Sequence, residues 1–446
     1  MSDASNGSLH PVGCLFVAYA YPPISAPGAV RITRALKHFD RSKIDPWVLT
    51  VADGHSLREG GLDDPLAEEP ERVIRVRDPL GGAAASARSA MAATDGRESL
   101  TRKTKRRLLE FASSLLVPDR RMLWALRCFS VARQLRGKGI SVIYSTSPSP
   151  ANHFVGYVLA RRLGAKWIAE FRDPLSWLTE ASRTSWIKRK FLAAIEGWAV
   201  RRASIVPVVS EPFAEYFRSR YPGANIVSIP NGADISPAEI EEVLSERARR
   251  PKSELLKIVH AGSLYGGDRD PSPVIAAALA AEQRYGTRLR VVFAGNDTHL
   301  ALEAARRLDA LHLVEDAGQR TFSETQNLLR AADVSVILLN AGGLGKIGIM
   351  SKFFDYLAAG APILVLGPKD AALSRIIAEE GAGAAFEADE IDQIGLWLSK
   401  VHALSPIDLR GLCKRWSGAK MATAIEQQVL CVGKASPRVS PVEAVA

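Results

Sequence analysis

The sequence predicts an α/β protein of two domains, because one local pattern recurs near the start of each half of the 446-residue chain. In the first half, an apolar strand at 13–21 leads into a loop rich in proline and glycine and then into a helix. In the second half, the strand at 256–260 leads into AGSLYGG and another helix. The length allows two hydrophobic cores, and 47% hydrophobic with 24% charged residues is ordinary for a globular protein.

A polar, charged stretch separates the two halves and predicts a linker. Further apolar strands are expected in each half, alternating with helical patterns as in a parallel sheet. The expected organisation is a disordered N-terminus at 1–11, a first domain at 12–236, a linker at 237–254, a second domain at 255–405, a C-terminal helix at 406–433 and a disordered tail at 434–446.

The cysteines and the N-terminus favour a cytoplasmic protein. The four cysteines lie far apart without a CxxC pair, which disfavours a zinc site or a disulfide framework and suits a reducing compartment. The N-terminal MSDASNGSLHPVG is polar and has no signal-peptide pattern. The apolar run at 14–21 is too short to span a bilayer.

The net charge of +10 predicts an anionic partner. A nucleotide-sugar, an acidic lipid surface and nucleic acid all satisfy this charge, but the basic residues are dispersed and do not alternate with aromatic residues, which disfavours nucleic acid. The segment 102–116 carries five basic residues followed by leucines. It predicts either the charged face of a domain helix or a helix that lies on an anionic membrane at the inner leaflet.

The stretch 342–368 predicts a ligand loop, a helix and a buried strand in quick succession. Its glycines allow the backbone to approach a ligand closely, and Ser351 is expected to cap a helix over 352–359. The positive end of that helix and the charge of Lys352 favour an anion such as phosphate. Asp355 lies three residues after Lys352, so both share one helix face. The alternative is an ordinary α/β unit with a glycine-rich loop.

Three segments resemble one family. SKFFDYLAAGAPIL at 351–364 resembles the donor-binding helix of retaining, GT4-like glycosyltransferases of the GT-B fold. KWIAEFRDPLSW at 166–177 is similar to a strand and loop in one branch of that family, and IPNGAD at 229–234 to the segment that closes the first domain. The resemblance implies two Rossmann-like domains facing a central cleft, with the C-terminal helix crossing back to the first domain.

The resemblance also implies a donor site in the second domain. Family members hold the nucleotide ribose with an acidic residue, more often glutamate, where this chain has Asp355. Many carry a second glutamate near the sugar, at the place of Ile347. In family members, basic residues in the first loop of the second domain bind the diphosphate. Here Arg269 matches one such position, and Ser263 offers only a hydroxyl at the other. The implied donor-binding residues are Gly28, Gly262, Ser263, Arg269, Gln319, Ile349, Ser351, Lys352 and Asp355.

The first domain is expected to supply the acceptor side. For several of its candidates a structural role is the alternative: Arg31 as a solvated helix residue, Arg172 with Asp173 as a local salt bridge. The acceptor-side residues implied are Arg31, Ser147, His153, Arg172, Asp173 and Trp177, and the catalytic residues implied are Arg269, Lys352 and His153.

The predicted function is that of a retaining glycosyltransferase. It would move a sugar from a nucleotide-diphospho-sugar to a glycan or lipid-linked acceptor, without a metal or other cofactor. The triplet 268–270 has the DxD form of a metal motif, but it lies in a phosphate-type loop without further carboxylates nearby in the sequence, so no metal is expected. Two alternatives stay open: a nucleotide-sugar 2-epimerase, which shares the architecture, and a non-catalytic GT-B-like scaffold subunit.

Overall fold

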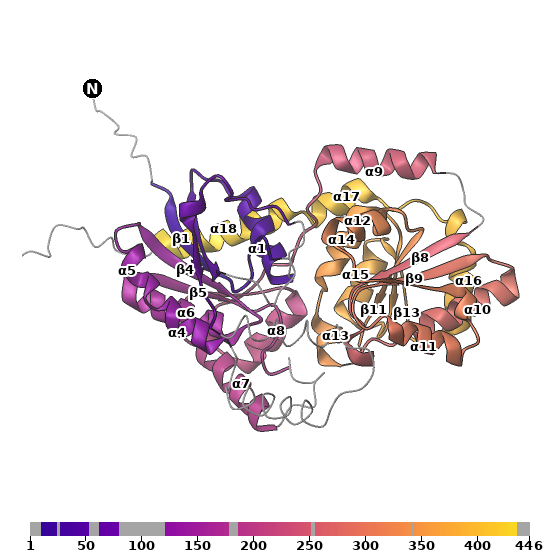
Figure 1. The fold of residues 1–446 in the computed structure, drawn as a ribbon, viewed down its shortest axis with the longest axis horizontal. Coiled ribbons are helices and arrows are strands. Elements are labelled where there is room, and N and C mark those ends of the chain that lie inside the picture. The colour runs from indigo at the N-terminus through magenta and orange to yellow at the C-terminus, as the bar shows by residue number, and fades with distance from the viewer. Residues whose placement is uncertain are drawn as a thin grey trace, which may run out of the picture.

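Two α/β domains lie side by side, with the N-terminal half of the chain in one and most of the C-terminal half in the other (Figure 1). The structure is a computed structural model that describes residues 10–24, 27–52, 62–79, 121–177, 186–250, 255–340 and 342–434. The basic segment predicted at 102–116, most of the N-terminus predicted to be disordered and the tail from 435 lie outside these residues.

The first domain is built on a parallel sheet with the strand order β3-β2-β1-β4-β5. Two further parallel strands, β6 and β7, continue it through bridges from β5. The strands are β1 (Val12–Val17), β2 (Ile44–Val51), β3 (Val73–Val76), β4 (Ile140–Thr146), β5 (Lys166–Glu170), β6 (Val206–Val208) and β7 (Ile226–Ser228). The helices are α1 (Pro27–His38), α4 (Met122–Cys128), α5 (Val131–Leu135), α6 (Pro150–Leu163), α7 (Trp186–Val200) and α8 (Glu211–Arg220).

Helices cover both faces of this sheet, because alternate residues of its strands are apolar on both sides. In β1, Leu15 and Val17 pack in a core with α4, α5 and α6, whereas Cys14 and Phe16 pack in a second core with α1. Helix α6 ends at Gly164, which adopts φ 67° and forms a left-handed C-cap.

The second domain repeats this architecture with the strand order β10-β9-β8-β11-β12-β13, all parallel. Its strands are β8 (Leu256–Ala261), β9 (Leu289–Ala294), β10 (Val314–Gly318), β11 (Val334–Leu338), β12 (Ile363–Leu366) and β13 (Gly383–Phe386). Its helices include α10 (Ser272–Tyr285), α11 (His299–Arg307), α12 (Phe322–Arg330), α13 (Gly343–Ile347), α14 (Ser351–Ala359), α15 (Ala372–Glu379) and α16 (Ile391–Ser399).

The stretch predicted as a linker forms helix α9 (Pro237–Arg249). Ser236 and Glu239 make a capping box at its start, and Pro237 occupies the first turn. Its buried Ile240 and Val243 pack against Leu409 and Cys413. The polar composition therefore belongs to the exposed faces of an ordered helix.

The predicted single C-terminal helix is broken into α17 (Leu409–Arg415) and α18 (Gly418–Lys434). The break lies where Ala233 pairs with Ser417 and its carbonyl accepts a hydrogen bond from Gly418. Helix α17 packs on α14 and α9, whereas α18 packs on α1 and places Ile425 and Val429 in a core of the first domain. The chain thus returns to its first domain, as expected for GT-B (Figure 1).

Candidate active site

The loop after β8 holds Arg269 toward the first domain. Gly262 opens the loop with φ 139°, a conformation that side chains rarely adopt. The hydroxyl of Ser263 accepts a hydrogen bond from Tyr265 N at 2.9 Å, and its carbonyl accepts one from Arg269 Nη1 at 3.2 Å. The Arg269 guanidinium lies 4.4 Å from the centre of the Tyr265 ring. Ser263 therefore builds the loop and positions Arg269.

Lys352 reaches the same loop from α14. Helix α14 begins at Ser351, with Met350 at the N-cap and no side-chain cap. The prediction that Ser351 caps the helix is therefore wrong, because this residue is already in the first turn. The hydroxyl of Tyr356 ties α14 to the end of β8: it accepts from Ala261 N at 2.8 Å and donates to Ala261 O at 3.0 Å.

The ammonium of Lys352 is buried beside the backbone of Gly262. A Cβ at Gly262 would lie 2.7 Å from Lys352 Nζ, so only glycine leaves room for this side chain. Among the described residues, Lys352 Nζ has no hydrogen-bond partner. Burial lowers the pKa of Lys352 well below its usual value, and the nearby Arg269 charge lowers it further. Burial also lowers the pKa of Arg269.

Two neighbouring, desolvated cationic groups are costly unless an anion accompanies them. Arg269 and Lys352 are such a pair, since each lies near enough to affect or be affected by the other's charge. The buried imidazole of His260, in β8 beneath them, has its pKa lowered first by burial and then by the Lys352 charge. An anion bound beside both groups would offset this cost.

Arg172 and Asp173 face this place from the first domain, at the end of β5. Ser147 holds Arg172 through its hydroxyl, which accepts from Arg172 N at 2.8 Å, and through its carbonyl, which accepts from Arg172 Nε at 2.8 Å. Gly28, at the start of α1, lies against the same guanidinium, since a Cβ there would be 3.3 Å from Arg172 Nη2. Burial raises the pKa of Asp173, and the charges of Arg172 and Arg269 oppose that rise.

Trp177 contacts the second domain directly. A Cβ at Gly343 would lie 2.9 Å from the Trp177 ring, whose centre is 4.5 Å from that of Tyr216. The glycine-rich loop is here the short helix α13, so part of the predicted loop is helical. Ser210 donates a hydrogen bond to Ile347 O at 2.6 Å, and the Ile347 side chain packs against a core of the first domain. The position of the family glutamate is thus an interdomain contact in this chain.

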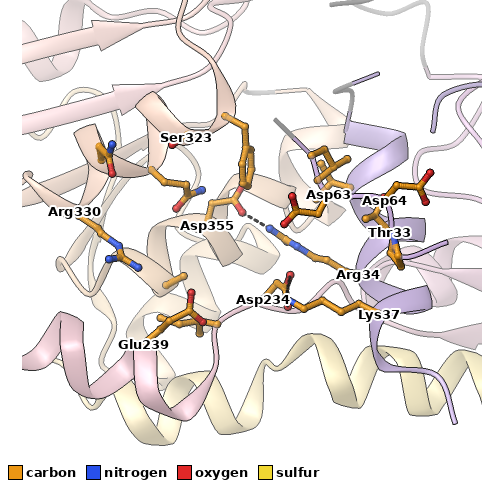
Figure 2. Close-up of a pocket in the computed structure, with 18 residues that line it drawn as sticks. Thr33, Arg34, Lys37, Asp63, Asp64, Asp234, Glu239, Ser323, Arg330 and Asp355 are labelled. Carbon is orange, nitrogen blue, oxygen red and sulfur yellow. Dashed lines mark hydrogen bonds and ion pairs between the residues drawn. The ribbon is translucent and has the colours of Figure 1, made fainter. Parts of the chain in front are cut away.

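Asp355 forms an ion pair with Arg34 of the first domain. Arg34 Nη2 lies 2.5 Å from Asp355 Oδ1, and Arg34 Nη1 donates to Gly232 O at 3.0 Å. Figure 2 shows this ion pair, with Arg34 extending from α1 to Asp355 on α14. The pair borders a pocket of about 530 Å³ between the two domains, which α12 also lines. The two faces of the cleft therefore meet at the residue predicted to hold the ribose.

Arg31 and His153 do not line the cleft surface. Arg31 is 2% exposed, and its guanidinium donates to Glu170 at 2.8 Å, Asn231 at 2.8 Å and the Ile229 carbonyl at 2.9 Å. The expectation that Arg31 faces substrate is therefore not met, because all its nitrogens serve the fold.

His153 is completely enclosed in the first domain. Its ring is stacked on Phe171 with the centres 4.5 Å apart, and Nδ1 lies 3.0 Å from Ser145 Oγ. Burial lowers the pKa of His153 to about 3, so the imidazole is neutral at physiological pH. This position gives His153 a place in the core rather than in contact with a reacting group.

Two other predicted donor-binding residues, Gln319 and Ile349, lie apart from the Arg269 and Lys352 pair. Gln319 is exposed after β10, where its side-chain amide contacts Asn296 after β9. Ile349 is buried in a core of the second domain.

The sequence analysis missed Tyr356 and Ser210, and it did not predict that Arg34 pairs with Asp355. Arg31 and Arg34 are visible as one helix face, but their partners lie 139 and 321 residues away.

Within the described ranges, no group of three or more histidine, cysteine, aspartate or glutamate side chains is arranged to hold a metal ion. No helix in the same part of the chain is both long and apolar enough to cross a membrane.

The two facing parallel-sheet domains, the returning α18 and the cationic loop in between define the GT-B class of architecture. Residues 28–232 match the family model described as a glycosyl transferase 4-like domain. This part of the chain is therefore similar to glycosyl transferase 4-like domains, and the chain as a whole has the GT-B fold.

Solved structures agree with this fold across almost the whole chain. Sucrose-phosphate synthase from Thermosynechococcus elongatus is similar with a TM-score of 0.59 and 12% identity, covering 94% of this chain and 96% of that one. The lipopolysaccharide outer core galactosyltransferase WaaB has a TM-score of 0.55 and 12% identity, covering 95% and 100%. WaaG, a glycosyltransferase involved in lipopolysaccharide biosynthesis, has a TM-score of 0.52 and 13% identity, covering 94% of this chain and 97% of that one. No curated protein matches the sequence significantly.

Proposed function

We propose that this protein is a retaining glycosyltransferase that uses a nucleotide-diphospho-sugar donor and a glycan or lipid-linked acceptor. The observation that carries the proposal is the buried, unpartnered ammonium of Lys352 beside Arg269, where the described residues supply no counter-charge to Lys352. A diphosphate would satisfy both groups, since each phosphate offers several acceptor oxygens. The hexosyltransferase class and the retaining outcome belong to the proposal.

The chemistry follows from charge development. As the bond from the sugar to the diphosphate breaks, negative charge gathers on the leaving phosphate, and groups already in place stabilise it without reorganising. Arg269 and Lys352 would do this from the second domain. Arg172 and Asp173 face them from the first domain, where the acceptor would enter. On this account the leaving phosphate takes the acceptor proton, so the buried His153 has no part in proton transfer.

Asp355 would bind the ribose with the oxygen that Arg34 leaves free. Arg34 pairs with Oδ1, so Oδ2 is the natural acceptor for a ribose hydroxyl. The proposed donor thus lies along one face of α14, with its diphosphate at Lys352 and its ribose at Asp355, one helical turn further on.

Thermal unfolding in the presence of nucleoside diphosphates and their sugars tests the donor proposal. A ligand that binds the folded state raises the melting temperature by mass action. We expect stabilisation by the diphosphates of one base, its loss in Lys352→Met, and its retention in the control Lys346→Met, whose exposed ammonium pairs with Asp370 at 3.0 Å. No stabilisation by any nucleotide would contradict the proposal. Turnover is then measured as release of nucleoside diphosphate.

One observation favours a second function, that of a non-catalytic scaffold subunit. Ile347 replaces the family glutamate and packs into the first domain, so the described site lacks that carboxylate near the sugar. A scaffold would bind no nucleotide-sugar, or would bind it without releasing nucleoside diphosphate over any acceptor tested.

A further inference from the structure

The outward face of α7 combines exposed apolar and basic side chains. Trp186, Ile187 and Phe191 are 59%, 61% and 42% exposed, and all three lie in the first two turns of one helix. Lys190 lies over the Trp186 ring, 4.8 Å from its centre. Buried Leu192 and Ile195 anchor the opposite face in the first domain. The helix is therefore firmly attached by one side and presents a second apolar surface to the outside.

Among residues 186–202, no acidic side chain is exposed. Between residues 186 and 202 the sequence has a single acidic residue, Glu196, and it is completely buried. Its carboxylate accepts a hydrogen bond from the Tyr221 hydroxyl at 2.7 Å, inside the domain. The exposed basic residues of the same stretch are Arg189, Lys190, Arg201 and Arg202.

The basic residues occupy both ends of the helix. Arg189 and Lys190 lie in its first two turns, whereas Arg201 and Arg202 directly follow its last residue. Arg202 lies over the ring of Trp198, 5.8 Å from its centre. The positive charge thus extends along the whole of α7, a helix of 15 residues.

We propose that this face of α7 docks the protein on an anionic lipid bilayer surface. Tryptophan and phenylalanine side chains enter the headgroup region, and basic side chains beside them bind acidic headgroups. Charge complementarity selects this partner, because the exposed side chains of residues 186–202 include four basic ones and no acidic one, which disfavours a second copy of the same stretch and favours an acidic surface. The proposal stands without the donor site and does not depend on it.

The place of α7 in the fold suits such contact. Figure 1 shows α7 along the outer edge of the first domain, away from the second domain. Trp177, which contacts Gly343 at the cleft, precedes the start of α7 by nine residues in the sequence.

Sedimentation of the full chain with lipid vesicles tests the proposal. We expect binding to vesicles of phosphatidylcholine with phosphatidylglycerol, weak binding to phosphatidylcholine alone, and release by high salt. Lys190→Glu reverses one charge and should weaken binding to the anionic vesicles by about tenfold. The double variant Ile187→Ser, Phe191→Ser should weaken binding to a similar extent, because both side chains are exposed and their loss leaves the core intact.

Matched controls lie in the second domain. Lys400→Glu makes the same charge change on an exposed residue of the second domain, and Leu311→Ser removes a side chain that is 46% exposed. Neither should change vesicle binding, and circular dichroism checks that all variants fold. Equal losses in the α7 and control variants would overturn the proposal. So would equal binding to both kinds of vesicle, or a dimer in the wild type that the α7 variants convert to monomer.

Discussion

Two buried basic groups, one in each domain, have opposite surroundings. In the first domain, Arg31 has Glu170 as a counter-charge, and Tyr144 and Thr146 complete the hydrogen bonds of that carboxylate at 2.5 and 2.6 Å. In the second domain, Lys352 has no partner among the described residues and has Arg269 as a neighbour. Removing one partner of a buried ion pair is strongly destabilising, whereas a buried cation without a partner is itself costly to the fold. The cost at Lys352 is the expected mark of a site that a ligand completes.

The largest expected effect follows from breaking the satisfied pair. Arg31→Met leaves Glu170 buried without its counter-charge, and this should lower the free energy of unfolding by about 3–5 kcal/mol. The measurement is urea unfolding at neutral pH. The control Arg41→Met removes an arginine from an exposed pair with Glu69 and should cost less than about 1 kcal/mol. Equal effects of the two variants would contradict the comparison.

His153 extends the comparison to a group buried without charge. Its pKa is about 3 in the folded protein and 6.5 when exposed, so the unfolded chain binds the proton first as the pH falls. Its contribution is fully present above pH 6.5 and is lost toward pH 3, at up to about 1.4 kcal/mol per pH unit.

Urea unfolding between these pH values checks the prediction. His153→Gln should flatten the fall in unfolding free energy relative to the wild type. The exposed His312, which pairs with Glu282 at 2.7 Å, provides the control variant His312→Gln. A wild-type profile that stays level from pH 6.5 downward would show that His153 is not held neutral.

Removal of the unsatisfied group should have the opposite sign to removal of Arg31. Lys352→Met replaces a buried amine with an apolar side chain, so the unfolding free energy should stay level or rise by about 1 kcal/mol. Urea unfolding without nucleotide is the measurement, with Lys346→Met as the exposed control. A loss of 3 kcal/mol or more would mean that Lys352 stabilises the fold, as Arg31 does.

The smallest effect is expected at the interdomain pair of Arg34 and Asp355. The Arg34 and Asp355 side chains are 8% and 21% exposed, and Asp355 keeps its contact with water when Arg34 is removed, so Arg34→Met should lower the unfolding free energy by about 1 kcal/mol or less. Nucleotide affinity, measured by calorimetry, should change more than stability does, because Arg34 orients the carboxylate proposed to bind the ribose. An unchanged affinity would remove Arg34 from the proposed site.

The sequence predicted the two-domain α/β fold because strands, glycine turns and helices are local signals. It failed where the outcome depends on distant partners. The apolar helix pattern near the C-terminus is continuous, but the pairing of Ala233 with Ser417 divides it. The polar residues at 237–249 predicted a linker without regular structure of its own; they form a helix with a capping box, whose buried Ile240 and Val243 pack against Leu409 and Cys413.

For the candidate site too, local sequence signals were readable and distant partners were not. Lys352 and Arg269 are visible because glycine-rich loops before helices predict anion sites, and the structure brings their charges near each other. Arg31 and Arg34 look alike in the sequence, since they share a helix face. Only the fold gives Arg31 the buried Glu170 and gives Arg34 the partly exposed Asp355, so their different roles were not readable.

The most direct test of the account is calorimetric binding of a nucleoside diphosphate and the matching monophosphate, in the wild type and in Lys352→Met. The account predicts that the wild type binds the diphosphate at least about tenfold more tightly, since the second phosphate adds charge-assisted contacts. It also predicts that Lys352→Met abolishes this preference while remaining folded. Equal affinities for the two nucleotides in the wild type would contradict the claim that Lys352 and Arg269 form a diphosphate site.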